Sequence, residues 1–262
     1  MPMTATTICE QWREDRTTLG CWLAIPSTVT AEASARCGFD YVCVDTQHGP
    51  LDFSDSVSMI QAILLGGSSP IVRVPRNEPG IIGKSFDAGA HGVIVPMVNT
   101  AAEAEQAVSA SRYAPRGARS WGPTVAGLRH DYFNWESGNV ACIPMIETTE
   151  ALSNLDEILA VPGIDAIYVG PADLSITLGL PPGNNDGSEA FDEALNFILE
   201  RCTAHGVIAG IQSTGALTPE RIAAGFRMVT VTTDLVAMRA GINAELALAR
   251  GEGSSGTESS LY

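Results

Sequence analysis

Five polar residues interrupt or closely follow runs of otherwise apolar sequence, and their types suit chemistry on a small anionic molecule. They are Asp45, His48, Arg73, Glu147 and Asp173. Glu147 and Asp173 are carboxylates with no cysteine and no histidine pair nearby. Such a pair suits a hard divalent cation, Mg²⁺ or Mn²⁺, rather than zinc. Two protein ligands leave coordination positions for water and substrate, so the cation would act as a Lewis acid.

The other three residues complete a coherent set. Arg73 stands in the pattern Ile-Val-Arg-Val-Pro, and a buried guanidinium needs an anionic partner. An arginine beside a cation can hold an oxyanion that develops on the substrate. His48 follows Asp45 by three residues and is the candidate general base. The turn before the predicted sixth helix offers backbone N–H groups to a carboxylate; it comprises Gly170, Pro171, Ala172 and Asp173. Together these features predict enolate chemistry on a 2-oxo acid.

Several of these positions also have a purely structural interpretation. Asp234 ends the last apolar run, and we expect it to be the N-cap of the following helix. Glu147 is a weaker candidate for a cap because Thr148 and Thr149 are better placed. Trp22 is either a core residue or part of the site.

The remaining histidines are less informative. His91 and His205 each end a helical stretch just before a strand, and we expect both to be structural. His130 lies in a long connection, and its role stays open.

Eight apolar, Val- and Ile-rich runs alternate with alanine-rich amphipathic stretches, many of which end in glycine. This pattern predicts a single-domain (β/α)₈ barrel over residues 18–250. A doubly wound open sheet is the alternative, but neither Gly-rich phosphate motif of that class is present.

Residues 1–17 form an extension, and 251–262 a Gly/Ser-rich tail that we expect to be disordered. The aromatic and basic connection 114–137 predicts a partner or substrate loop. The expected strands span residues 18–25, 41–45, 70–75, 92–98, 141–147, 166–173, 207–213 and 227–234.

Composition excludes several functions for this chain of 262 residues. The formal charge is −15, so a nucleic-acid-binding face or a polybasic membrane anchor is not expected. Lys84 is the only lysine, so Schiff-base chemistry would have to use it. No apolar run reaches 18 residues, so we expect no transmembrane helix, and the polar, acidic N-terminal stretch predicts no secretory signal. The six cysteines form no CxxC pair and predict reduced core thiols in a cytoplasmic protein.

Five ordered motifs resemble the HpcH/HpaI family of metal-dependent (class II) pyruvate aldolases. They are Val-Asp-Thr-Gln-His-Gly, Val-Arg-Val-Pro, Pro-Arg-Gly-Ala-Arg, Ile-Glu-Thr and Val-Gly-Pro-Ala-Asp-Leu-Ser, and the resemblance covers roughly residues 18–250. The family also includes 2-keto-3-deoxy sugar-acid aldolases and macrophomate synthase, and the segment 119–123 is similar to the latter branch.

The resemblance implies a role for each matching residue. Glu147 and Asp173 would bind Mg²⁺ or Mn²⁺, with Co²⁺ as a further candidate. Arg73 would stabilise the enolate oxygen. His48, paired with Asp45, would act as base through a water. The substrate-binding set would comprise Trp22, the backbone of Gly170, Pro171, Ala172 and Asp173, and Arg116 near a subunit interface. The resemblance also implies a homohexamer, a trimer of dimers, that exchanges its last helix between subunits.

Two positions depart from the family pattern. Gln47 stands where many members carry Glu, and Met145 stands where Gln is frequent. Both departures change the polar surroundings of the predicted ligands and base, and therefore bear on which substrate the site accepts. We expect a lyase that cleaves a 4-hydroxy-2-oxo acid to pyruvate and an aldehyde. The alternatives are an oxaloacetate decarboxylase similar to macrophomate synthase and, more remotely, a non-catalytic binder of oxo acids.

Overall fold

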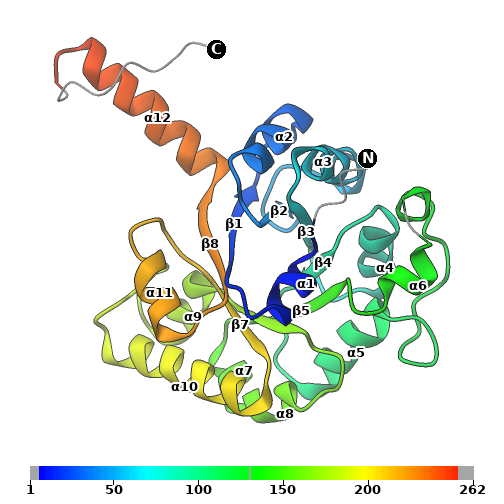
Figure 1. Cartoon of the computed structure of the whole chain (residues 1–262). Coiled ribbons are helices and arrows are strands. Elements are labelled where there is room, and N and C mark those ends of the chain that lie inside the picture. Colours follow the sequence, from blue (N-terminus) through cyan, green and yellow to red (C-terminus); the bar gives the residue numbers. More distant parts are fainter. Residues whose placement is uncertain (1–5, 130, 253–262) are drawn as a thin grey trace.

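The chain forms a closed barrel of eight parallel strands, seen in the computed structural model, which describes residues 6–129 and 131–252 (Figure 1). Each strand pairs with the next along the chain, and β8 pairs with β1 to close the barrel. The predicted (β/α)₈ barrel is therefore confirmed, and the open-sheet alternative is wrong. The strands are β1 (Thr18–Leu23), β2 (Tyr41–Asp45), β3 (Ser69–Arg73), β4 (Gly92–Val95), β5 (Ala141–Ile146), β6 (Ala166–Val169), β7 (Ile208–Gln212) and β8 (Met228–Thr233).

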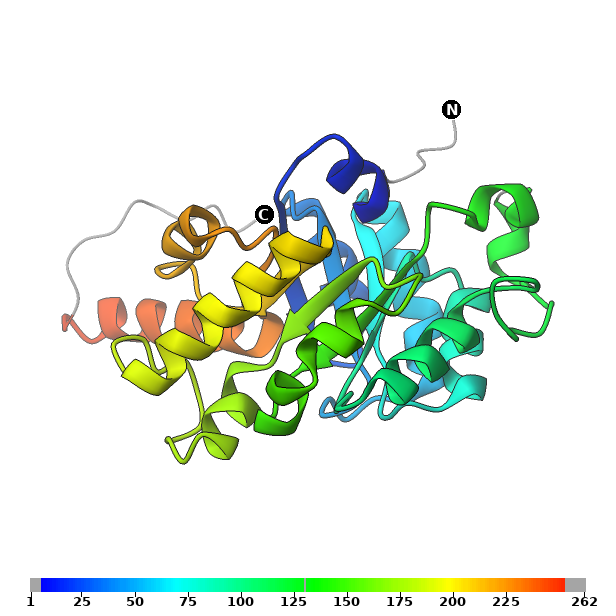
Figure 2. The same cartoon turned by 90° about the horizontal axis from the view of Figure 1, so that it is seen from below.

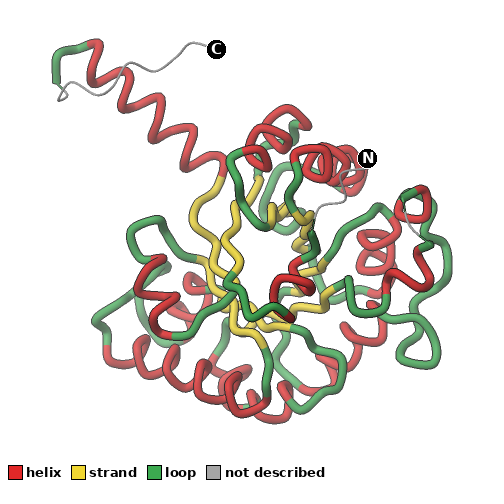
Figure 3. Tube along the Cα trace, in the orientation of Figure 1, coloured by secondary structure: helices red, strands yellow, loops and turns green. Residues whose placement is uncertain are grey.

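Most helices surround the strands, while α1 lies at one end of the barrel (Figures 2 and 3). The indole Nε1 of Trp12 on α1 donates to Thr18 Oγ1 on β1 at 3.1 Å, which holds α1 there. The helices are α1 (Ile8–Arg13), α2 (Thr28–Arg36), α3 (Phe53–Gly66), α4 (Pro79–Asp87), α5 (Ala101–Ser111), α6 (Tyr132–Glu136), α7 (Thr149–Ser153), α8 (Leu155–Leu159), α9 (Pro171–Thr177), α10 (Glu189–His205), α11 (Thr218–Ala224) and α12 (Asp234–Ala249), with a 3₁₀ turn η1 (Ala126–Leu128).

The strands are apolar on both faces because each face is covered. One set of alternating side chains fills the barrel interior, with Tyr41 and Cys43 on β2 and Tyr168 on β6 among its members. The other set, which includes Val42 and Val44, packs outward against the helices. This explains why the runs are continuous rather than alternating in hydropathy. Across the part of the chain described here, no helix combines the length and apolar character needed to cross a membrane.

Polar side chains fix where several helices begin at the carboxyl ends of the strands. Ser27, Asp52 and Glu78 each accept hydrogen bonds from backbone N–H groups of the first helical turn. Thr148 caps α7 in the same way, as expected, so Glu147 is free of that role. These caps end the strand-to-helix loops sharply and so shape the rim of the barrel.

Most strands end earlier than predicted, and two polar residues are placed differently as a result. The sixth strand ends at Val169, so Asp173 lies in the first turn of α9 rather than on the strand. Asp234 is the first residue of α12, and Thr233 is its N-cap, so the expected cap is off by one residue. The Asp234 carboxylate instead accepts from the N–H groups of Ala24 and Ile25, at 3.0 and 2.9 Å, and also from Leu235 N–H at 2.7 Å.

The connection 114–137 is ordered around one buried arginine. Arg119 forms an ion pair with Asp87 at 2.6 Å and donates to Tyr132 Oη at 3.3 Å. Its guanidinium also lies 4.5 Å from the ring of Tyr113. The extra length of this segment thus folds as α6 and η1 against α4. His130 and residues 253–262 of the expected tail lie outside the described residues.

The last helix, α12, projects away from the barrel (Figure 1). Asp234 is its only buried residue. Large apolar side chains are exposed along the rest of it, namely Leu235, Val236, Met238, Ile242, Leu246 and Leu248. A helix that exposes this much apolar surface is typical of an element that packs against a partner.

The cysteines provide a test of the packing. Five are buried, and burial raises the pKa of Cys9, Cys21 and Cys202 to about 12. Cys37 is exposed. We expect Ellman's reagent at pH 8 to modify one thiol rapidly in the native protein and six in denaturant. Loss of the rapid phase in Cys37→Ser is the control; two or more fast thiols would contradict the packing.

Candidate active site

The carboxyl ends of the strands, here called the mouth of the barrel, gather the predicted residues. Asp45 ends β2 and Arg73 ends β3, and these two residues are direct partners in the register of the two strands. Glu147 follows β5, and Asp173 follows β6 by four residues. Because all strands are parallel, the residues at their ends share one face of the barrel, where barrel enzymes hold their chemistry.

Arg73 and Asp45 form a buried, two-pronged ion pair. Arg73 Nε donates to Asp45 Oδ1 at 2.8 Å, and Nη2 donates to Oδ2 at 2.6 Å. Both side chains are about nine-tenths buried. Asp45 is thus the anionic partner that a buried arginine requires. This geometry occupies two donor nitrogens of the guanidinium and leaves Nη1 outside the pair.

His48 contacts Asp45 through its backbone. The N–H groups of Gln47 and His48 both donate to Asp45 Oδ1, at 3.1 and 3.3 Å. Among the described residues, no hydrogen bond joins the Asp45 carboxylate to the His48 imidazole. The carboxylate fixes the loop that carries His48, and the predicted pairing with the imidazole stays a prediction.

Trp22 lies inside the mouth between two partners. The guanidinium of Arg73 is 4.4 Å from the centre of the indole ring. The ring of Tyr168 stacks on Trp22 with a centroid distance of 5.4 Å. Tyr168 is held in turn by hydrogen bonds of its hydroxyl with Thr230 and Gln212. Tyr168 was not identifiable as a site residue from the sequence, because a tyrosine inside a strand has the same pattern as an ordinary core residue.

Glu147 is buried, and its position depends on two neighbours. Its Oε1 accepts the backbone N–H of Met97 at 2.7 Å. Met97 has φ = 55°, a left-handed conformation that costs a non-glycine residue about 1–2 kcal/mol. A Cβ on Gly170 would lie 2.4 Å from Glu147 Oε2 and 3.0 Å from Met145 Cε, so only glycine fits there. Neither Met97 nor the spatial role of Gly170 was identifiable from sequence spacing.

The charges around Glu147 fit a bound cation. Burial raises the pKa of Glu147, and the negative charge of Asp173 raises that pKa further. The Met97 N–H and the positive charge of Arg73 lower it. A buried carboxylate and a partly buried one that repel each other are stabilised when a divalent cation neutralises them. Within the described residues, Met97 provides the only hydrogen bond to this carboxylate, so Oε2 is available as a ligand.

The predicted carboxylate-binding turn is only partly able to donate. Gly170 is the N-cap of α9, and Pro171 opens the helix without an N–H. The free donors of the first turn are therefore the N–H groups of Ala172 and Asp173.

Arg116 lies away from the mouth of its own barrel. It belongs to the connection between α5 and β5, which runs at the amino-terminal end of the strands. Its side chain is half exposed and contacts the buried Glu136 at 3.3 Å. Any contact of Arg116 with substrate would therefore have to occur in a neighbouring subunit.

The residues expected to be structural, and the only lysine, lie away from the mouth of the barrel. His91 is buried, and its Nδ1 is hydrogen-bonded to Ser69 Oγ at 3.0 Å. His205 pairs with Asp156 at the end of α10. Lys84 lies on α4, outside the ring of strands, with its Nζ 5.1 Å from the centre of the Phe53 ring. A Schiff base on Lys84 could not reach the barrel interior.

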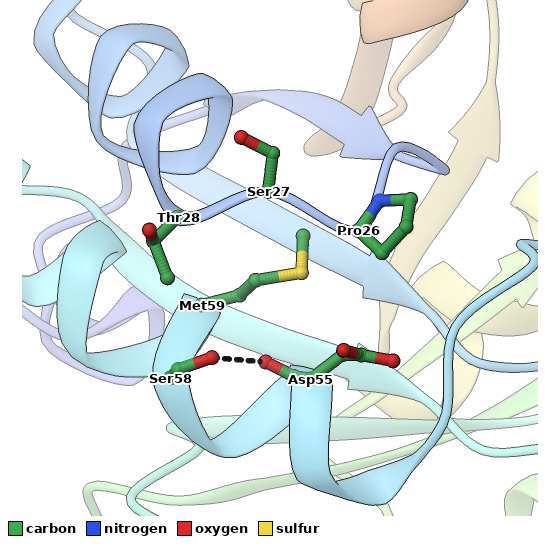
Figure 4. Close-up of a pocket in the computed structure, with 6 residues that line it drawn as sticks. All are labelled: Pro26, Ser27, Thr28, Asp55, Ser58 and Met59. Carbon is green, nitrogen blue, oxygen red and sulfur yellow. Dashed lines mark hydrogen bonds between the residues drawn. The ribbon is translucent and has the colours of Figure 1, made fainter.

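A polar cavity of about 320 Å³ borders the mouth between the β1–α2 loop and α3 (Figure 4). In Figure 4 its walls are Pro26, Ser27 and Thr28 from the loop and α2, and Asp55, Ser58 and Met59 from α3. It lies beside the ring of strands rather than over Glu147 and Arg73. The cavity therefore belongs to the rim.

Comparisons with known proteins agree with this architecture. Residues 18–240 match the sequence profile of the HpcH/HpaI aldolase/citrate lyase family. The hydroxypyruvate/pyruvate aldolase of Rhizorhabdus wittichii is 43% identical over 242 residues, covering 91% of this chain and 96% of that protein. A family protein of Burkholderia cenocepacia has a TM-score of 0.86 at 31% identity, covering 93% and 98% of the two chains. Macrophomate synthase has a TM-score of 0.85 at 26% identity, covering 96% and 91%.

The fold and these similarities identify the protein as a lyase with a (β/α)₈ barrel. The chain belongs to the HpcH/HpaI aldolase/citrate lyase family. The family resemblance deduced from the five sequence motifs is thereby confirmed.

The close approach of Gly170 to Glu147 gives a test of the cation site. Gly170→Ala should force the carboxylate away and weaken Mn²⁺ affinity about 10- to 100-fold, measured by isothermal titration calorimetry. Gly215→Ala is the matched control, because a Cβ at Gly215 meets its nearest atom at an ordinary 3.9 Å. Equal affinity in the two variants would show that Glu147 is not a ligand.

Proposed function

We propose that the enzyme is a divalent-metal-dependent pyruvate aldolase, which reversibly cleaves a 4-hydroxy-2-oxo acid to pyruvate and an aldehyde. The observation that carries the proposal is the buried Glu147 beside Asp173, with Arg73 close enough for its charge to lower the Glu147 pKa. Relatives named as aldolases of pyruvate and hydroxypyruvate support the choice of a 2-oxo acid. Glu147 and Asp173 would hold Mg²⁺ or Mn²⁺, which supplies Lewis-acid stabilisation of the enolate.

Arg73 is the residue that shares the charge of the enolate. Its guanidinium is fixed by Asp45 on one side and by the Trp22 ring, so its remaining donor Nη1 keeps a set position. Donors that are already oriented stabilise a developing oxyanion without reorganising during the reaction. The N–H groups of Ala172 and Asp173 would bind the carboxylate of the oxo acid.

His48 is proposed to move the proton of the substrate hydroxyl. During cleavage the C4 hydroxyl loses its proton to the base. The C3–C4 bond breaks at the same time, and the electron pair of that bond passes to C3. The reverse addition returns that proton to the new alkoxide. Asp45 holds the His48 loop through the backbone N–H and so positions the base at the mouth.

A second candidate reaction is decarboxylation of oxaloacetate, which would produce the same enolate by loss of CO₂. The TM-score of 0.85 with macrophomate synthase is the observation that favours it. Release of CO₂ from oxaloacetate, compared with cleavage of hydroxy-oxo acids at equal enzyme concentration, separates the two activities.

Exchange of the pyruvate methyl protons with D₂O, followed by NMR, tests the proposed enolate. We expect exchange with Mg²⁺, its loss in EDTA, and recovery when Mg²⁺ is restored. Arg73→Ala should abolish both exchange and aldol cleavage, because nothing else in the buried pair can replace the guanidinium. Full exchange in the chelator would disprove the proposal.

Two controls accompany this experiment. Lys84→Ala removes the only lysine and should exchange at the rate of the unmodified enzyme. Arg73→Ala leaves Asp45 buried without its partner, which costs about 3–5 kcal/mol, so circular dichroism must show that the variant is folded. Arg73→Lys keeps a positive charge and should retain part of the exchange if charge alone is sufficient.

We propose that the active protein is a homo-oligomer, a hexamer on the family resemblance, in which α12 packs on a second copy. The support is the apolar surface that α12 leaves exposed. Val236→Asp with Ile242→Asp should lower the molar mass measured by light scattering, because it places two charges in the contact. Asn243→Asp on the same helix should not, and an unchanged mass in the double variant would refute the role of α12.

A further inference from the structure

The indole N–H of Trp22 is a buried donor without a partner. Trp22 is 5% exposed, and its Nε1 has no hydrogen bond to any of the residues that the structure describes. The ring cannot turn freely to find one, since Arg73 lies 4.4 Å from its centre and Tyr168 stacks on it. An unsatisfied buried donor destabilises the folded protein by about 1–3 kcal/mol. A donor left unpaired beside Arg73 therefore needs a functional explanation.

Trp12 shows that the fold satisfies an indole where it only needs packing. Trp12 is buried at the opposite end of the barrel, and its Nε1 donates to Thr18 Oγ1 at 3.1 Å. The two tryptophans thus differ in the partner of the N–H rather than in burial. Trp22 is the one that lies at the mouth, next to the guanidinium proposed to hold the enolate.

We infer that Trp22 Nε1–H is a specificity-determining donor to an oxygen on C3 of the 2-oxo acid. This inference rests on the proposed function. In that function Ala172 and Asp173 bind the carboxylate, Arg73 meets the C2 oxygen, and His48 serves the aldehyde oxygen. The remaining acceptor on a 2-oxo acid is a hydroxyl on C3, which hydroxypyruvate carries and pyruvate lacks. A site with a buried donor for that hydroxyl discriminates against the substrate that leaves the donor unpaired.

The test is a competition in which hydroxypyruvate and pyruvate, at equal concentration, react with one aldehyde and Mg²⁺. The ratio of the two aldol products is independent of how much enzyme is active. Trp22→Phe keeps an aromatic ring against Arg73 but removes the N–H, and it should lower the hydroxypyruvate-to-pyruvate product ratio roughly tenfold. Trp12→Phe is the matched control, which should lower the melting temperature but leave the ratio unchanged.

The outcomes separate the inference from the function on which it rests. An unchanged ratio in a folded Trp22→Phe enzyme overturns the role of Trp22 while the aldolase activity stands. An equal loss of both products assigns the N–H to the aldehyde or to pyruvate itself, and also overturns it. No product from either oxo acid, even in the unmodified enzyme, overturns the proposed function and this inference together.

A second measurement needs no variant at this position. The chain has four tryptophans, so ¹⁵N-tryptophan labelling gives four indole signals. With Mg²⁺ present, one indole signal should move on addition of hydroxypyruvate and move less with pyruvate, while the signal changed by Trp12→Phe stays in place. Identical shifts with both oxo acids would contradict a contact with the C3 oxygen.

Discussion

A guanidinium buried at the mouth of the barrel has to be neutralised, and the pairing of β2 with β3 meets this demand. The register places Asp45 opposite Arg73, where the carboxylate accepts from two nitrogens of the guanidinium. The same carboxylate accepts the N–H groups that begin the His48 loop, so one aspartate orients both an arginine and a candidate base. Trp22 completes the surroundings by covering the guanidinium with its ring.

The carboxylate side of the site is built by close packing. Glu147 has room for its Oε2 because Gly170 has no side chain, and its Oε1 is fixed by a backbone N–H from the strained Met97. The layer beneath is equally tight. A Cβ on Gly20 would lie 2.1 Å from the Tyr41 ring, so the absence of a side chain at Gly20 leaves space for that tyrosine inside the barrel. Thr230 hydrogen-bonds both Tyr41 and Tyr168, and Tyr168 supports Trp22. Small residues and polar core contacts therefore determine where the reactive side chains lie.

The carboxyl end of β1 connects the site to α12. At the start of α12, Asp234 accepts the N–H groups of Ala24 and Ile25, just beyond the end of β1. The helix that exposes most apolar surface is thus anchored beside Trp22. The proposed contact between subunits and the proposed substrate contact share one short segment of backbone.

The sequence alone determined the barrel and the residues of its mouth. Eight doubly covered strands leave continuous apolar runs, and a charge at the end of such a run can only lie at the strand end, so Asp45, Arg73 and Glu147 were identifiable. Tertiary structure decided their partners, because contacts between strands depend on register, which spacing along the chain does not encode. It assigned Asp45 to Arg73, Met97 to Glu147 and Tyr168 to Trp22, and it placed Asp173 on a helix rather than a strand. The unpartnered N–H of Trp22 is likewise visible only once every neighbour of the ring is in place.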